Sequence, residues 1–96
     1  MNILQPTADP AQQSLDACAR LLAAIFQPGE QVWICEAAYE INEPIWRVTL
    51  LCPGERGVWV FRRYRYDIPS GTLHFTGMMP AGEADLAVAR RSGRPL

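Results

Sequence analysis

The segment that most constrains the fold is residues 58–66 (VWVFRRYRY), where aromatic side chains recur at the two-residue spacing of a β-strand. Its four rings belong to Trp59, Phe61, Tyr64 and Tyr66. The first two and the last two have opposite parity, so a regular strand would send them to opposite faces of a sheet. A β-bulge, which adds one residue, would bring all four rings onto one face. We therefore predict a bulge at Arg62 and Arg63, between the two pairs.

The aromatic segment belongs to one of four predicted strands, which are separated by short turns. The strands are residues 31–41, 45–52, 57–67 and 72–77. The segments between them are rich in proline, glycine and asparagine, which are typical turn residues. Connections this short place neighbouring strands antiparallel. The sequence therefore predicts a four-stranded antiparallel meander.

Turns of four residues would fix how these strands pair. The expected cross-strand pairs are Tyr39:Val48, Ala37:Leu50, Cys35:Cys52, Leu50:Trp59, Val48:Phe61, Tyr66:Leu73 and Tyr64:Phe75. All of them lie on apolar faces of their strands. They form one continuous apolar face only if the third strand contains the predicted bulge.

Two further segments have helical patterns. Residues 10–26 carry an apolar stripe at helical spacing, formed by Leu15, Cys18, Leu22 and Ile25. Asp9 is the predicted N-cap, Pro10 suits the first helical position, and a Pro-Gly pair ends the helix. Residues 82–91 form a shorter candidate helix, with acids at its start and arginines at its end, as the helix dipole favours.

These elements predict a single α+β domain over residues 1–96. We expect the N-terminal helix to pack on the apolar face of a four-stranded antiparallel meander sheet (residues 31–77), with a short C-terminal helix or tail beside it. Residues 1–8 are a lead-in and residues 92–96 are a frayed tail. A chain of this length builds one core by burying roughly 60–65% of its unfolded surface.

The cysteine count and the net charge limit the cellular compartment and the kinds of partner that we expect for the protein. Three cysteines without a CxxC pair argue against a disulfide framework or a zinc site. The first residues lack the basic and apolar regions of a signal peptide, and no apolar run reaches the ~18–20 residues that cross a membrane. A net charge of −1 gives no general attraction to nucleic acid or anionic membranes. We therefore expect a cytoplasmic protein with no cofactor or metal.

Catalytic residues are not predicted. His74 is the only histidine, and we expect it on the solvent side opposite Arg65, without the orienting acid and nucleophile that a catalytic histidine needs. Cys18, Cys35 and Cys52 all fall on predicted inward faces, where cysteine acts as a small hydrophobe. A disulfide between Cys35 and Cys52, which face each other in the predicted register, stays open as an alternative.

The best functional candidate is a charged face of the sheet. Its predicted members are Glu36, Glu40, Arg47, Arg62, Arg63 and Arg65. Arg47 is expected opposite Glu40, which would make an ion pair, and also opposite Arg62, where two like charges need an acid nearby. Glu40 is that acid, or else a ligand or partner supplies it. A solvated sheet face, a protein-docking face and an anion site are all compatible with this group.

One family resemblance follows from the order of the elements. After the N-terminal helix, residues 46–48 (WRV) lie on one strand and residues 64–73 (YRYDIPSGTL) span a later hairpin. This arrangement, over residues 10–77, resembles small PepSY-type domains of the cystatin-like fold. The resemblance implies a non-catalytic binding or inhibitory role. Such domains often lie outside the cytoplasm, and the missing signal peptide departs from that, so no location, partner or site residue carries over.

We therefore expect a small, non-enzymatic protein-interaction module that uses the outer sheet face or an edge strand. Its partner would be another protein or a second copy of the chain, as in a homodimer. One alternative is binding of an anion or single-stranded nucleic acid through the Arg-rich strand. Another is a small-ligand pocket between helix and sheet, lined by Trp33, Trp46 and Tyr39.

Overall fold

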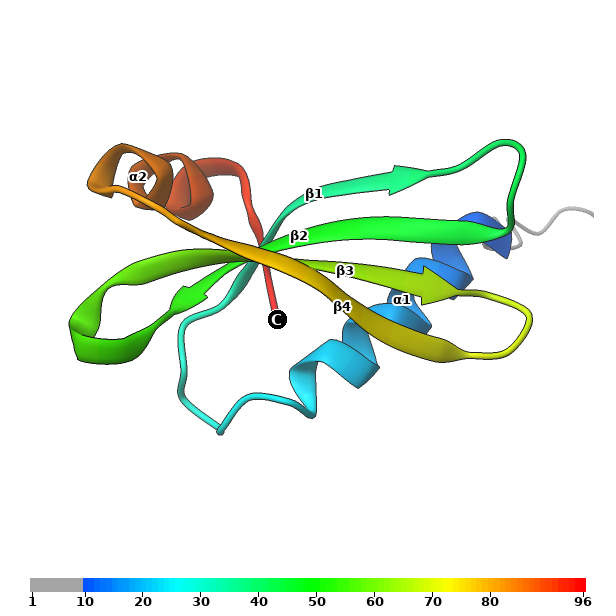
Figure 1. Cartoon of the computed structure of the whole chain (residues 1–96), viewed down its shortest axis with the longest axis horizontal. Helices are drawn as coiled ribbons and strands as arrows, with labels where there is room; N and C mark the ends of the chain where they lie inside the picture. Colours follow the sequence, from blue (N-terminus) through cyan, green and yellow to red (C-terminus); the bar gives the residue numbers. More distant parts are fainter. Residues whose placement is uncertain (1–9) are drawn as a thin grey trace, which may run out of the picture.

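The computed structural model describes residues 10–96 as a twisted antiparallel sheet accompanied by two α-helices (Figure 1). In chain order the elements are α1 (Pro10–Ala23), β1 (Trp33–Tyr39), β2 (Ile45–Pro53), the short 3₁₀ helix η1 (Glu55–Gly57), β3 (Trp59–Asp67), β4 (Thr72–Pro80), α2 (Glu83–Ser92) and β5 (Arg94–Pro95). The predicted α+β class and the helix–meander–helix order are confirmed. The predicted lead-in and the cap Asp9 lie outside the described residues.

The sheet has five strands rather than four, because the end of the chain adds β5. The strand order is β4-β3-β2-β1-β5, and Arg94 and Pro95 pair with the start of β1. The Leu96 N–H donates to the Val32 carbonyl oxygen at 2.9 Å, and the Arg94 guanidinium bonds the Asp16 carboxylate at 2.9 Å. The prediction of a frayed tail was therefore wrong. A residue that precedes proline favours an extended backbone, which suits Arg94 to a strand.

Only one of the three predicted registers is correct. In the β3–β4 hairpin, Tyr66 pairs with Leu73 and Tyr64 with Phe75, as expected. The β1–β2 register is shifted because Ile41, assigned to the strand for its apolar side chain, lies in the turn and is 93% exposed. The β2–β3 register is shifted because η1 lengthens that connection.

The shifted pairs change the neighbours of several residues. The observed pairs are Tyr39:Trp46, Ala37:Val48, Ile34:Leu50, Leu51:Phe61, Pro53:Trp59 and Leu50:Arg62. In η1, Arg56 has φ 57° and Gly57 has φ 74°, so two successive residues adopt left-handed backbone that a plain four-residue turn would not need. Local turn chemistry, rather than the apolar pattern of the strands, sets both registers.

The predicted bulge in β3 is not present, and a bulge occurs in the neighbouring strand β4 instead. β3 pairs with β2 without any shift, so β3 itself is regular. Tyr64 faces Phe75 while the preceding Arg63 faces Gly77, which leaves Thr76 of β4 as the extra residue. The four rings of β3 therefore do not share a face, and the prediction that they do was wrong.

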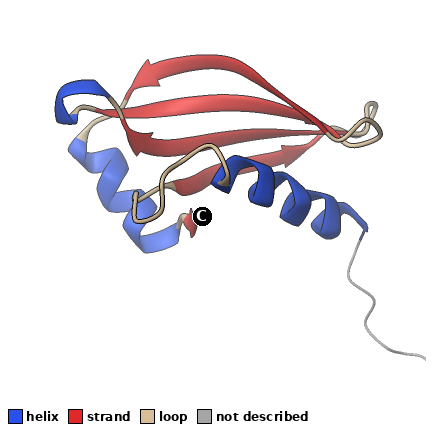
Figure 2. Cartoon of the chain, turned by 90° about the horizontal axis from the view of Figure 1, so that it is seen from below, coloured by secondary structure: helices blue, strands red, loops and turns tan. Residues whose placement is uncertain are grey.

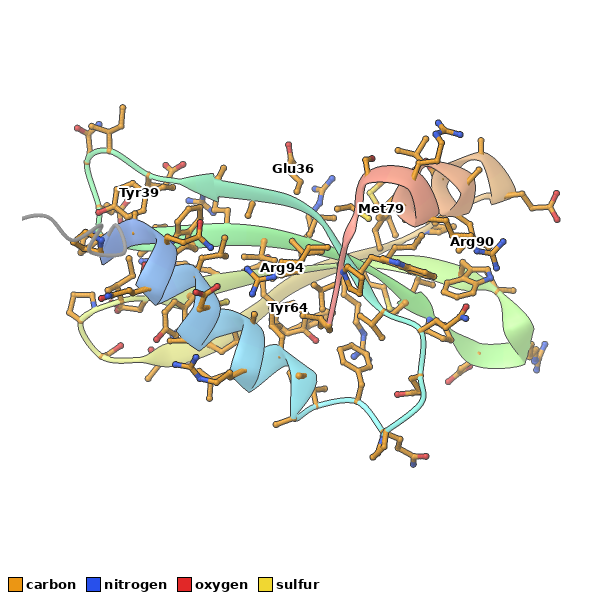
Figure 3. The ribbon with its side chains drawn as sticks, turned by 180° about the vertical axis from the view of Figure 1, so that it is seen from behind. Glu36, Tyr39, Tyr64, Met79, Arg90 and Arg94 are labelled. Carbon is orange, nitrogen blue, oxygen red and sulfur yellow. The ribbon has the colours of Figure 1, made fainter. Side chains whose placement is uncertain are left out.

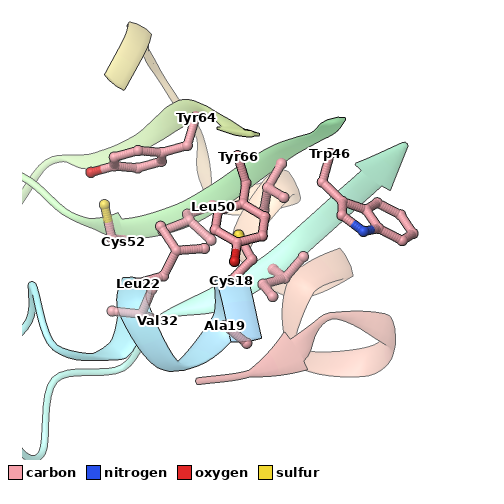
Figure 4. Packing of buried hydrophobic residues seen from close by; sticks show 11 residues of the cluster. Cys18, Ala19, Leu22, Val32, Trp46, Leu50, Cys52, Tyr64 and Tyr66 are labelled. Carbon is pink, nitrogen blue, oxygen red and sulfur yellow. The ribbon is translucent and has the colours of Figure 1, made fainter. Parts of the chain in front are cut away.

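The first face of the sheet packs against α1 (Figure 4). Its core contains Cys18, Ala19, Leu22, Val32, Ile34, Trp46, Val48, Leu50, Cys52, Tyr64 and Tyr66. The even-numbered residues of β2 face α1, as the alternation in residues 45–52 predicted. The indole Nε1 of Trp46 also donates to Ser14 Oγ at 2.7 Å, which fixes α1 over the strand.

A second apolar surface lies on the opposite face, where the end of α2 packs against the start of β1. The helices α1 and α2 lie towards opposite ends of the sheet (Figure 2). Leu51 is next to Leu50 in β2, so its side chain points away from α1, and yet it is fully buried. Trp33 and Trp59 lie with ring centroids 5.9 Å apart on this side. Sequence reasoning expected one apolar face and left the docking of the second helix open. Neither α1 nor α2, the helices among residues 10–96, is long and apolar enough to cross a membrane.

Gly93→Ala is expected to destabilise the fold by about 1–3 kcal/mol through overpacking. A Cβ at Gly93 would lie 2.7 Å from the Ala89 carbonyl oxygen and 3.0 Å from Trp33 Cβ, so the end of α2 would have to move off β1. Urea unfolding measures the loss. Gly77→Ala is the control, because its Cβ would meet nothing within 4 Å. Equal stability of the two variants would contradict the close docking of α2.

Candidate interaction face

The candidate site is the part of the second face that α2 leaves uncovered, which we call the open face. Two cross-strand rows make it up: Glu36, Thr49, Arg63 and Gly77 in one, and Ala38, Arg47, Arg65 and His74 in the other. Figure 3 shows Glu36 pointing outwards from β1, on the side away from Tyr64. Each strand from β1 to β4 therefore contributes to one charged surface.

A hollow of about 370 Å³ lies in this surface. It is lined by Glu36, Ala38, Arg47, Val48, Thr49, Arg63, Tyr64 and Thr76. Small side chains such as Ala38 and Thr49 sit between longer charged ones, which leaves the centre of the face low. The bulge in β4 directs Thr76 into the lining. The alternation in β2 predicted that Thr49 and Arg47 lie on the same face of the sheet. No local pattern in the sequence predicted that Thr76 joins them.

Two ion pairs neutralise part of the open face. Arg47 Nε lies 3.7 Å from Glu40 Oε2, and Arg65 Nη2 lies 3.3 Å from Glu43 Oε2. The predicted Arg47–Glu40 pair is thus present, although Arg47 lies directly opposite Ala38. Both pairs are about half exposed, so each adds only about 0–1 kcal/mol to stability. Their main effect is to offset the repulsion between Arg47 and Arg65, which face each other across β2 and β3.

Arg63 differs from the other two arginines of the open face. Its Nη2 donates to the Met79 sulfur at 3.4 Å, and no acid among residues 10–96 forms an ion pair with it. Glu36 likewise has no ion pair within the described part of the chain. The Arg65 Nε is buried and has no hydrogen-bond partner among residues 10–96. Unsatisfied charge is therefore concentrated beside the hollow.

Arg62 was placed on this face by the sequence, and the structure corrects that. Because β3 is regular, Arg62 lies on the α1 side together with the tyrosines. Its guanidinium carbon is 5.6 Å from the Phe26 ring centroid and 5.9 Å from that of Phe75, and Nη1 donates to the Tyr64 hydroxyl at 3.4 Å. Its aliphatic stem and cation–π contacts cover the edge of the core. Arg62 is therefore not opposite Arg47.

The cysteines do not form a reactive group. Cys18 and Cys52 are buried, whereas Cys35 is exposed where the β1–β2 register shifts, so its predicted inward position was wrong. Cys35 does not pair with Cys52, and all three thiols are free. Burial raises the pKa of Cys18 to about 11 and also raises the pKa values of Cys35 and Cys52. Each thiol therefore stays protonated at neutral pH.

His74 and the aromatic residues take positions that the sequence predicted in part. His74 is exposed opposite Arg65, as expected, and its Nε2 lies 3.2 Å from the Thr72 hydroxyl. Trp46 stacks edge-on with Tyr39 at 5.3 Å, while Trp33 contacts Trp59 on the other face, so the three residues of the proposed ligand pocket do not meet. Within residues 10–96, no group of histidine, cysteine and acidic side chains is arranged to hold a metal ion.

Comparison with known proteins gives no relative for this chain. No protein-family model matches it, and neither a curated protein nor a solved structure is significantly similar to it.

Proposed function

We propose that the chain is a small, non-enzymatic protein-interaction module that binds a partner protein on its open face. The observation that carries the proposal is Arg63, an exposed cation without an acid partner in the described chain, next to a hollow. A carboxylate of the partner would satisfy Arg63, and a basic group would satisfy Glu36. Such paired complementarity favours a partner surface of mixed charge and sets its orientation.

Nucleic acid is the second candidate and is less well supported. Single-stranded nucleic acid is bound by aromatic rings that stack on bases beside arginines that contact phosphates. Here the rings of Tyr64 and Tyr66 are buried in the core on the α1 side, away from Arg63 and Arg65. Glu36, Glu40 and Glu43 also border the open face, and their carboxylates would repel phosphate.

The absence of an enzymatic role, the cytoplasmic location and the family resemblance remain parts of the proposal. Protonated thiols and a histidine next to Thr72 rather than an acid support a binding role over catalysis. Three free thiols fit a reducing compartment. The order of α1 followed by an antiparallel meander supports the resemblance to PepSY-type domains, which act as binding or inhibitory modules.

Arg63→Ala is expected to weaken partner binding by about tenfold or more, because it leaves the partner's carboxylate buried and unpaired in the interface. Arg56→Ala is the matched control, since Arg56 is exposed in η1 and outside the open face. The partner would first be captured from the native host with the wild-type chain. Its affinity for wild type and both variants would then be measured by calorimetry with purified components.

The two variants separate the candidate functions. Retained affinity in Arg63→Ala, with folding confirmed by circular dichroism, would remove the open face as the docking surface. Binding to a single-stranded oligonucleotide that weakens steeply with salt would favour the nucleic-acid candidate instead. Turnover of a substrate that a single side-chain change abolishes would contradict the non-enzymatic assignment.

A further inference from the structure

The β4 strand leaves a long, uncharged edge of the sheet exposed. It has nine residues, it is the last strand in the order β4-β3-β2-β1-β5, and among residues 10–96 it pairs only with β3 (Figure 1). The nearest charged side chains in the sequence are Asp67 and Glu83, on either side of it. An edge strand presents unpaired backbone N–H and C=O groups to any strand that can align with it.

The opposite edge of the same sheet is protected. β5 covers the start of β1, the β1–β2 register shifts at Cys35, and Glu36 and Glu40 place charges along the remainder. These are the devices by which proteins prevent edge-to-edge pairing. β4 has two of these devices as well, the bulge at Thr76 and Pro80 at its last position, but it contains no aspartate, glutamate, lysine or arginine. Charge therefore distinguishes the two edges. The contrast within one sheet marks β4 as the edge that is available for pairing.

Apolar side chains accompany the open backbone of β4. Phe75 is 56% exposed and Met78 is 60% exposed, and both lie on the α1 side of the sheet. Phe75 already contacts Tyr64 edge-on at 5.5 Å, so this row continues the core outwards from β3. A strand added beside β4 would bury the row and extend the core.

We propose that β4 pairs antiparallel with β4 of a second copy of this chain, around a two-fold axis perpendicular to the sheet. The result is a homodimer with one continuous sheet and both α1 helices on the same side. A second copy fits because an uncharged strand meets no like charge when it pairs with itself. Thr76 also lines the hollow of the open face, but dimerisation is measured on the isolated chain and partner binding with the Arg63 variant, so the two proposals can fail independently.

The bulge restricts the register of this dimer. Residues directly opposite in an antiparallel pair have side chains on the same face. Before Thr76 the odd-numbered residues of β4 face α1, and after it the even-numbered residues do. When a residue that precedes Thr76 in one copy pairs with a residue that follows Thr76 in the other copy, one of the two must therefore be odd-numbered and the other even-numbered. Pairing Phe75 with the partner's Met78 meets this condition and sets Thr76 beside the two-fold axis, where the two bulges match.

The test is a charge-exchange experiment at Thr76, followed by sedimentation equilibrium of the full chain. Thr76→Lys and Thr76→Glu each place two like charges near the axis, and each should weaken the dimer by about two- to fivefold, with the larger effect for Thr76→Lys because Arg63 lines the same hollow. An equimolar mixture of the two variants should restore it, because the new charges are then opposite. Gln13→Lys adds the same charge as Thr76→Lys at an exposed site on α1, outside β4, and should leave the dimer intact.

Three results would overturn the proposal. The first is that the wild-type chain remains monomeric up to millimolar concentration. The second is that the charge exchange has no effect: the dissociation constant of the dimer is unchanged in both Thr76 variants, or mixing the two folded variants does not restore the wild-type value. The third comes from hydrogen exchange: a monomer with protected β4 amides that lose protection when residues 1–9 are deleted would show that this segment, and not a second copy, occupies the edge.

Discussion

Truncation of Leu51 to alanine is expected to lower the free energy of unfolding by about 2–5 kcal/mol, as much as truncation of its neighbour Leu50. Both side chains are fully buried, and they point to opposite faces of β2. A sheet with one apolar face would tolerate one of the two changes. A domain of this kind has only about 5–15 kcal/mol of total stability, so either variant should unfold at much lower urea concentration than wild type.

The pair of leucines also tests whether the two faces are independent. Leu50 packs against α1, while Leu51 lies on the face that α2 covers. The two residues are adjacent in one strand, so the double variant measures their coupling, and a loss equal to the sum of the two single losses shows that the faces are independent. Ile41→Ala is the control, since Ile41 is almost fully exposed and its truncation should cost less than about 0.5 kcal/mol. A small loss for Leu51→Ala would mean that α2 does not cover this face in solution.

The parts of the fold that could be predicted from the sequence are those set by local patterns, and the second apolar face is not one of them. Alternation in residues 45–52 correctly separated the two sides of β2, and the tight turn after β3 correctly set the β3–β4 register, where the Gly71 N–H donates to the Asp67 carbonyl oxygen at 2.9 Å. α2 carries few large apolar residues, and its docking depends on the close approach of Gly93 to Trp33. That contact joins segments far apart in the sequence, so no local pattern announces it.

The candidate site was predicted in the main, with one wrong member. Five of its six residues lie on or beside the open face. Alternation in β2 and in β1 after its register shift places Arg47 and Glu36 there. Arg63 and Arg65 share one parity of the regular strand β3.

Arg62 was misplaced because the change of parity among the rings of β3 was interpreted as a bulge, whereas β3 is regular and its rings lie on two apolar faces. The bulge at Thr76 lies in the neighbouring strand, and the second apolar face accepts Trp59 and Phe61 without any correction in β3.

Alkaline pH is expected to destabilise the protein through Cys18. Burial raises the pKa of this thiol from 9.0 to about 11, so between these values the unfolded chain loses the proton while the folded chain keeps it. The stabilisation is fully present below pH 9 and is lost as the pH rises towards 11. A shift of two pKa units corresponds to about 2–3 kcal/mol. Urea unfolding of the wild type across this pH range measures the decline.

Cys18→Ala separates the contribution of this thiol from every other group that titrates in the same range. The free energy of unfolding of the variant should fall less than that of wild type as the pH rises. At neutral pH it should be lower than that of wild type, because alanine leaves a small cavity. Cys35→Ala, which removes an exposed thiol, should keep most of the wild-type decline. Burial also raises the pKa of Cys52, so the double Cys18/Cys52 variant should have the flattest profile. Parallel profiles for wild type and Cys18→Ala would show that α1 does not seal Cys18 from water, and would place the fault in the packing of α1 on the sheet.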